Sequence, residues 1–265
     1  MTVTETGPPD AERGTPAPRP RSASPSLAFD RVSMVYPDGT AALDDVSFEV
    51  GPGEFTTVVG PSGCGKSTLL RIAAGLTKES SGKVTVGTDQ LGFVFQDATL
   101  LPWRTVLGNA ELLLELHGMN KADRRAKALE ALRSVGLTGF ERHHPKRLSG
   151  GMRMRVSIAR SLTLDPSVFL FDEPFGALDE ITRERLNEEL LRLFVDKGFA
   201  GLFITHSIFE AVFLSTRVLV MSARPGRIVA DIPVPFPYPR PDELRFDPRV
   251  AEIAGQISAA LRGAH

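Results

Sequence analysis

The stretch GPSGCGKST, residues 60–68, constrains the fold of this chain more than any other part of its sequence. A short β-branched run at 55–60 comes directly before it. After Lys66, apolar residues recur at helical spacing, at Leu69, Leu70, Ala73 and Leu76. The pattern G-x-x-x-x-G-K-[ST] between a strand and a helix is the P-loop motif. We therefore predict an α/β fold in which this loop joins a strand of a mostly parallel sheet to a helix.

The same loop has the composition of a phosphate-binding site. Glycines let backbone N–H groups converge on an anion at close range, and the following helix adds the positive end of its dipole. We expect Lys66 to reach the β- and γ-phosphates and Ser67 to offer its hydroxyl to Mg²⁺. The alternative is a glycine turn with a structural role only, and the flanking strand and helix argue against it. The expected nucleotide-binding residues here are Gly60, Pro61, Ser62, Gly63, Cys64, Gly65, Lys66, Ser67 and Thr68.

A second strand-like run, VFLF at 168–171, ends in two acidic residues. The run is apolar at every position, which is typical of a central parallel strand, and open α/β sheets bind ligands at the carboxyl ends of such strands. We expect Asp172 to hold Mg²⁺, through water. Glu173 has no cation in sequence range and is suited to take a proton from an attacking water. The alternative for both residues is a helix cap before Pro174.

Two other polar residues also end strand-like runs. Gln96 closes LGFVF at 91–95, and its amide is suited to bond Mg²⁺ or the attacking water. His206 follows LFIT at 202–205. Taken alone, Gln96 is better explained as a surface residue, and a lone strand-end histidine is more often structural. The functional interpretation of His206 gains support because we expect it at the same sheet edge as Asp172.

The sequence LSGG at 148–151 is a second candidate anion site. Ser149, Gly150 and Gly151 lead directly into a helical segment, whose N-terminus favours anions. One triphosphate is already surrounded by the first loop, and the chain has one set of Mg²⁺-binding and water-activating residues. The simplest arrangement is two copies placed head to tail, in which each closes its Ser149 loop over the ATP held by the other. Hydrolysis then weakens the interface.

The rest of the chain alternates between strand and helix patterns. Strands are expected at 27–36, 42–50, 83–86 and 201–205, a helix at 180–197, and a hairpin joining 217–221 to 227–234. The segment 104–165 is predicted to be almost entirely helical. One of its helices is predicted to start at Asn120, to stop at Gly136 and to bury Ala122, Ala126, Leu129 and Leu132. Residues 1–25 have the composition of a disordered tail rich in Pro, Ser and Thr.

Composition excludes some classes of protein. A net charge of −1 argues against a general nucleic-acid binder. No stretch approaches the ~20 apolar residues of a membrane span, and 1–25 lacks the apolar run of a signal peptide. The single cysteine, Cys64, cannot form an intrachain disulfide and indicates a reducing compartment. It occupies a free position of the loop motif, where we expect a thiol reagent to block the pocket.

These motifs together resemble the ATP-binding subunit of an ABC transporter over nearly all of residues 27–262. The matching stretches are GPSGCGKST, FVFQ, LSGG, FLFDEP, GALD at 176–179 and ITHS at 204–207, in the order and spacing of that family. The resemblance implies a P-loop NTPase core of mostly parallel sheet, an antiparallel β subdomain and an inserted α-helical subdomain. The ATPase domain is then expected over 26–262, with the helical insertion at about 97–165.

The resemblance also implies roles for single residues. Tyr36 matches the aromatic residue that stacks on adenine, and Gln96 the residue that links Mg²⁺ to the membrane subunit. Glu173 matches the catalytic base and His206 the residue that contacts the γ-phosphate. Asp179 matches the acidic residue that contacts the opposite protomer.

Three further stretches resemble the branch of importers for nitrate, sulfonate and taurine. They are DATLLPWRTVLGNA at 97–110, SARPGRI at 222–228 and the Pro/Arg-rich FPYPRPDELR. This resemblance implies a second ATPase subunit, identical or related, two membrane permease subunits, a separate solute-binding protein and a place at the cytoplasmic face of the membrane. Trp103 is expected on the surface that receives the permease, the alternative being a core anchor. Met154 and Ser207 depart from the glutamine and aspartate usual at these positions, and neither change removes a group needed for hydrolysis.

Two other functions are alternatives to an importer. ABC-type ATPases that act on nucleic acid or the ribosome usually carry a second ATPase half, a long coiled-coil insertion or a basic arm, and none is found in this sequence. A small-molecule kinase can use the same P-loop, but it has no use for the LSGG stretch at 148–151.

Overall fold

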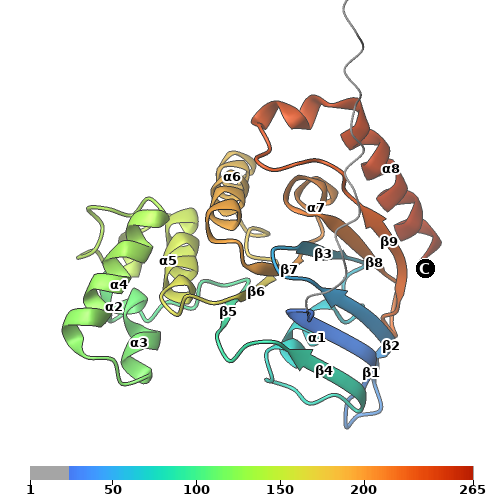
Figure 1. Ribbon diagram of the computed structural model, residues 1–265, viewed down its shortest axis with the longest axis horizontal. Helices are drawn as coiled ribbons and strands as arrows, with labels where there is room; N and C mark the ends of the chain where they lie inside the picture. Colours follow the sequence, from blue (N-terminus) through green and yellow to red (C-terminus); the bar gives the residue numbers. More distant parts are fainter. Residues whose placement is uncertain (1–23, 265) are drawn as a thin grey trace, which may run out of the picture.

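The strands form two sheets that lie against each other (Figure 1). The computed structural model describes residues 24–264, so nearly all of the tail predicted at 1–25 lies outside the described residues. The smaller sheet is antiparallel, in the order β2-β1-β4, and consists of β1 (Leu27–Val35), β2 (Ala41–Val50) and β4 (Ser81–Val86). The larger sheet has the order β5-β6-β7-β3-β8-β9 and consists of β3 (Phe55–Val59), β5 (Leu91–Val94), β6 (Val168–Asp172), β7 (Ala200–Ile204), β8 (Arg217–Met221) and β9 (Ile228–Pro233).

The larger sheet is parallel from β5 to β8, and only β9 runs antiparallel. Its inner strands are buried on both faces, as the apolar run at 168–171 predicted. Along β6, Val168 and Leu170 pack toward the antiparallel sheet and α1 (Lys66–Ala73), whereas Phe169 and Phe171 pack toward the helices of the other face. This alternation follows from the two-residue period of a strand. Parallel strands bring their carboxyl ends to one edge, where the predicted site residues lie.

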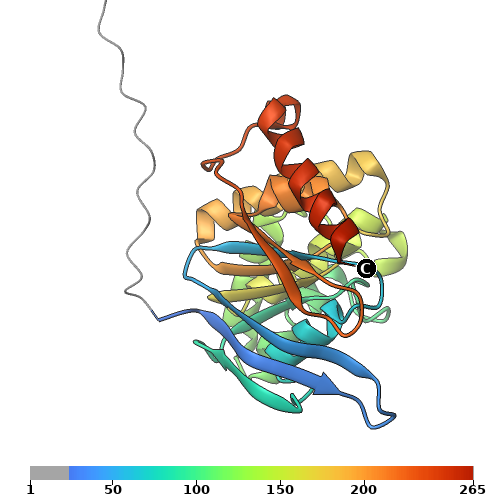
Figure 2. The same ribbon diagram turned by 90° about the vertical axis from the view of Figure 1, so that its right-hand side faces the viewer.

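Helices cover the other face and the far end of the larger sheet. They are α6 (Glu180–Lys197), α7 (Ile208–Leu214) and α8 (Pro248–Gly263), with a 3-10 turn, η2 (Asp242–Phe246), before α8. In Figure 2, α8 and the antiparallel sheet lie on opposite sides of the larger sheet. None of the helices between residues 24 and 264 has both the length and the apolar character that a membrane crossing requires.

A group of helices is inserted between β5 and β6 and projects beyond the β5 edge of the sheet (Figure 1). It consists of α2 (Val106–Ala110), α3 (Leu112–Leu116), α4 (Lys121–Ser134), the 3-10 turn η1 (Pro145–Arg147) and α5 (Gly150–Leu162). Asn120 caps α4, because its side chain accepts from two backbone N–H groups of the first turn. The prediction of nearly continuous helix is wrong for 135–144, where Gly136 and Gly139 adopt positive φ and turns replace the helix.

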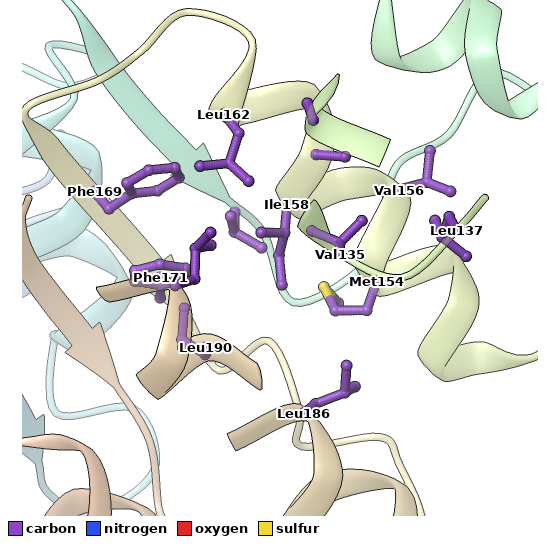
Figure 3. Close-up of a cluster of buried hydrophobic side chains, with 14 of the residues drawn as sticks. Val135, Leu137, Met154, Val156, Ile158, Leu162, Phe169, Phe171, Leu186 and Leu190 are labelled. Atoms are coloured by element: carbon purple, nitrogen blue, oxygen red, sulfur yellow. The ribbon is translucent and has the colours of Figure 1, made fainter. Parts of the chain in front are cut away.

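The predicted buried face of α4 is also wrong in its first half. Ala122 and Ala126 are exposed and Leu129 is half-buried, whereas Ala128, Ala131 and Leu132 are buried. The helix packs on its neighbours only toward its C-terminus. Figure 3 shows the residues that follow α4, Val135 and Leu137, beside Met154, Val156 and Ile158 of α5, in a cluster that continues to Phe169, Phe171, Leu186 and Leu190. The inserted helices therefore share one hydrophobic core with the larger sheet.

Candidate functional site

The glycine-rich loop forms the turn between β3 and α1, as predicted. Gly63 and Gly65 have φ values of 74° and 110°, in the region that favours glycine. A Cβ on Gly65 would lie 2.6 Å from the Ala42 carbonyl oxygen of β2, so no side chain fits there. The loop is therefore held between the parallel sheet and the antiparallel sheet, with its backbone open to a cavity.

Residues from distant parts of the sequence meet around this cavity. They are Tyr36, Ala42, Ser62, Gly63, Gly65, Lys66, Ser67, Thr68, Glu173 and Arg224. Of these, all but Ala42 and Arg224 were predicted as site residues. The cavity therefore lies where the end of β1, the start of α1, the end of β6 and the β8–β9 turn meet.

Lys66 lies at the base of the cavity with its side chain only 7% exposed. Its Nζ donates hydrogen bonds to the carbonyl oxygens of Gly60 (2.8 Å) and Pro61 (3.0 Å). It also lies 3.9 Å from Oε1 of Glu173. Glu173 has no cation in sequence range, but the fold brings Lys66 to it. A buried cation and a carboxylate therefore face each other beside the glycine-rich loop.

Glu173 also contacts His206, whose Nδ1 lies 3.2 Å from its Oε2. The backbone of Glu173 has a φ of 45°, a costly conformation for a residue other than glycine. Its N–H donates to the carbonyl oxygen of Ile204 (3.0 Å), which ties the end of β6 to the end of β7. Two strand ends thus hold the carboxylate and the imidazole together, as expected for residues at one sheet edge.

Ser67 and Asp172 form the second pair at this edge. The Ser67 hydroxyl donates to Oδ1 of Asp172 at 3.0 Å. Burial raises the pKa of the Asp172 carboxyl, although the Ser67 hydrogen bond and nearby cations oppose the shift. A hydroxyl and one carboxylate fit Mg²⁺, which usually takes one or two carboxylates from the protein and the remaining oxygens from phosphates and water.

Two contacts shape the outer side of the cavity. The Tyr36 hydroxyl lies 3.0 Å from the Thr68 hydroxyl, which ties Tyr36 to the first turn of α1. Arg224 donates from Nε and Nη2 to the Gly63 carbonyl oxygen, at 3.0 and 2.9 Å. The position of Arg224 could not be read from the sequence, because neither periodicity nor a nearby motif ties the β8–β9 turn to the loop.

The Ser149 loop lies at a different cavity. That cavity is lined by Ser149, Gly151, Met152, Arg155, Thr182 and Arg185, and it shares no residue with the first. Ser149 caps α5, because its Oγ accepts the Met152 N–H at 3.2 Å. Asp179 caps the neighbouring α6 through the Thr182 N–H at 3.0 Å, and this hydrogen bond lowers the pKa of its carboxyl. Within one protomer, the second glycine loop thus does not close over the first.

The remaining predicted residues are less central. Gln96 is exposed and does not line the cavity, although the pairing of Val94 with Phe171 places it at the same sheet edge as Asp172. Cys64 is 1% exposed and burial raises the pKa of its thiol, and both properties oppose the expected reaction with a thiol reagent. Trp103 is 72% exposed, which excludes the core-anchor alternative.

The two departures from the usual motif residues have simple structural consequences. Met154 is buried in the hydrophobic cluster of α5 (Figure 3). Ser207 caps α7, because its Oγ accepts the Glu210 N–H at 3.3 Å. A serine can serve at this position because its oxygen supplies the acceptor that an N-cap needs.

The ABC transporter family matches residues 43–176 of the chain. A putative ATP-binding protein of Brucella abortus is 45% identical over 244 residues, which cover 89% of this chain and 94% of that protein. A taurine import ATP-binding protein of Yersinia pestis is 48% identical over 205 residues, 75% of this chain and 80% of that protein. The chain is also similar to a solved dimeric structure of an ATP-binding cassette in a post-hydrolysis state, bound to ADP and phosphate. The TM-score is 0.70 at 33% sequence identity, and the match covers 79% of this chain and 99% of the cassette chain.

Proposed function

Because the chain belongs to the ABC transporter family, we propose that it is the ATP-hydrolysing subunit of an importer for a small anionic solute of the nitrate, sulfonate or taurine type. Lys66 and Glu173 line one cavity, and Glu173 contacts both Lys66 and His206; this is the observation that carries the hydrolytic part of the proposal. The likeness to a taurine import protein and the stretch at 97–110 support the type of solute.

Hydrolysis requires a water molecule in line with the γ-phosphorus and a group that removes its proton. Glu173 is the proposed base: it takes the proton as the water oxygen bonds to phosphorus. The bond from phosphorus to the bridging oxygen breaks, and its electrons leave with ADP. Lys66 and the backbone N–H groups of 60–68 stabilise the charge on the phosphate oxygens.

Other proposed roles surround this step. Tyr36 stacks on adenine, and the His206 imidazole contacts the γ-phosphate beside Glu173. Ser67 and Asp172 would hold Mg²⁺, with Gln96 at the same edge. When bound, the ion neutralises charge on the phosphate oxygens.

The second glycine loop is proposed to act on a partner protomer. Ser149, Gly150 and Gly151 begin a helix that opens to its own cavity, and Asp179 lies at the start of the adjacent helix. Two copies placed head to tail, or this chain and a related one, would each supply this loop to the ATP of the other. The dimeric form of the similar cassette supports this arrangement.

The proposed assembly places the chain at the cytoplasmic face of a membrane, beside two permease subunits that receive solute from a binding protein. The exposed indole of Trp103 on the inserted helical segment supports a docking surface there. We propose that residues 26–262 form the ATPase domain, with the helical part at about 97–165.

The test is to purify the chain with and without its permease partners. We expect phosphate release from ATP alone, and a faster rate when the reconstituted complex is given taurine, nitrate or a sulfonate together with the binding protein. Absence of ATP hydrolysis in every preparation would refute the proposed function. Stable capture of ribosomes or nucleic acid in place of a permease would favour the non-transport ATPase.

A further inference from the structure

Glu210, on α7, is a buried carboxyl group that none of the steps above uses. It is 3% exposed and does not line either cavity. Burial of a carboxyl group destabilises the folded state unless its oxygens are hydrogen-bonded or paired with a cation. Its Oε2 accepts from the Thr205 hydroxyl, and its Oε1 faces the amide of Asn187 (3.5 Å) and the guanidinium of Arg183 (4.0 Å). Glu210 therefore lies between two segments, each of which leads to the ATP site.

The first segment carries His206. Both residues that flank this histidine are bonded to Glu210. The Thr205 hydroxyl donates to the carboxylate and accepts the Ser207 N–H at 3.0 Å, while the Ser207 hydroxyl accepts the Glu210 N–H at 3.3 Å. The backbone on either side of His206 is thus fixed to the first turn of α7, which leaves the imidazole itself directed to Glu173.

The second segment, 175–178, follows the catalytic carboxylate and leads to Asp179. Arg183 on α6 donates from Nε to the Phe175 carbonyl oxygen (3.3 Å) and from Nη2 to the Leu178 carbonyl oxygen (2.8 Å). The same guanidinium faces Glu210, with Nε 4.0 Å from Oε1. One side chain therefore bonds both ends of this segment and is itself oriented by the buried carboxylate.

These contacts close into a ring, because the His206 Nδ1 lies 3.2 Å from Glu173 Oε2. The ring runs from Glu173 along 175–178 to Arg183, on to Glu210, and through Thr205 to His206. We propose that Glu210 is a positioning residue for ATP hydrolysis, which holds Arg183 and the His206 backbone in the register that brings the imidazole to the catalytic carboxylate. The proposal rests on the proposed function.

A glutamine at this position separates a positioning role from a merely structural one. Burial raises the pKa of Glu210, which means that its charged form is disfavoured by its surroundings. Glu210→Gln keeps the shape and an acceptor for Thr205, removes the buried charge and weakens the attraction for Arg183. We therefore expect thermal stability to stay equal or to rise while turnover falls. A structural role would lower both.

The experiment compares full-length Glu210→Gln, Arg183→Gln and the double variant with wild type. Steady-state hydrolysis gives kcat and KM, nucleotide titration gives Kd, and a thermal melt gives Tm. The matched controls are Glu188→Gln and Arg192→Gln, a carboxylate and a cation of α6 that pair with each other outside the ring. We expect kcat to fall about tenfold, within the ~10²-fold cost of a 1 Å misplacement, with KM and Kd within about twofold of wild type. The controls should match wild type.

Each outcome decides between the possibilities. Since Glu210 and Arg183 act through one link, the double variant should lose no more than the worse single variant. A wild-type kcat in Glu210→Gln, losses that multiply in the double variant, or parallel losses of kcat and Tm would overturn the inference. If Glu210→Gln does not fold, Arg183→Gln alone tests the link by the same measurements. If wild type hydrolyses ATP and the variants equal it, only this inference fails, whereas an inactive wild type refutes the proposed function and the inference with it.

Discussion

Glu173→Gln is the most informative change, because it alters one charge and little else. Glutamine has nearly the same size as glutamate. It keeps a side-chain oxygen that can contact His206, whose Nδ1 lies 3.2 Å from Oε2 of Glu173 in the wild-type structure. It cannot accept the proton of the attacking water. A positioned base contributes about 10²–10⁴ in rate, which corresponds to about 2.7–5.5 kcal/mol of the activation free energy. We expect turnover to fall by that factor.

The same change should not weaken ATP binding. Glu173 Oε1 lies 3.9 Å from Lys66 Nζ, so the carboxylate competes with the phosphates for this cation and repels them. The gross attraction at this distance is about 4 kcal/mol at an effective dielectric constant of about 20. The Glu173 side chain is 24% exposed, so solvent screens part of it. The Kd for ATP should therefore stay equal or decrease.

Three measurements test this prediction. Phosphate release gives the rate, titration with a fluorescent ATP analogue gives Kd, and light scattering gives the oligomeric state. We expect a slow enzyme that binds ATP well and accumulates as an ATP-bound dimer. Hydrolysis within about tenfold of wild type would refute the base assignment, since a general base is worth more than that. A variant that stays monomeric with saturating ATP would count against the head-to-tail arrangement.

Four further changes test other parts of the site. Lys66→Ala should abolish tight ATP binding, because the phosphates lose their buried cation, and an unchanged Kd in calorimetry would contradict the loop assignment. Ser149→Arg, mixed with wild type, should inactivate the mixed dimers, whereas full activity of the mixture would show that the loop is not used by the partner. Arg224→Ala should raise the Kd for ATP several-fold, because Arg224 lines the cavity, and Arg227→Ala on the same turn is the control that should not. Because the pKa of Asp172 is raised in the folded state, the native protein binds the proton of this carboxyl more tightly than the unfolded chain does. The free energy of unfolding should therefore fall as the pH rises from the ordinary pKa of 3.8 through the raised pKa. Asp172→Asn should lack this part of the pH dependence in urea titrations, and identical profiles would show that the shift is absent.

Local patterns were sufficient for much of the fold. The glycine loop, the buried run of β6 and the cap at Asn120 were correct because each depends on neighbours in sequence: a turn, a two-residue period, a helix end. The α7 helix was not predicted, because its local sequence carries no such pattern. Its sequence, IFEAVFL, is buried nearly all round, so it shows no polar face from which a helical period could be read.

Contacts between distant segments could not be predicted in the same way. Ser67 and Asp172 are 105 positions apart, and their hydrogen bond depends on the strand order that places β6 near β3. The ion pair of Lys66 with Glu173 has the same origin. The buried face of α4 was misassigned because packing, not periodicity, decides which half of that helix meets α5.

The position of the second glycine loop would relate hydrolysis to the proposed dimer interface. Gly150 and Gly151 lie so close to Leu178 and Thr182 that a Cβ on them would come within 3.0 and 2.6 Å, so the loop is packed on the start of α6. The P-loop is instead held between β3 and the antiparallel sheet. The segment 175–178 connects Glu173 directly to the surface on which the second loop rests. A displacement of Glu173 on phosphate release would therefore reach the loop proposed to act on the partner through only a few residues, and it would reach its own P-loop backbone only through the side chain of Lys66. Each protomer would in this way loosen its grip on the partner's nucleotide after hydrolysing its own.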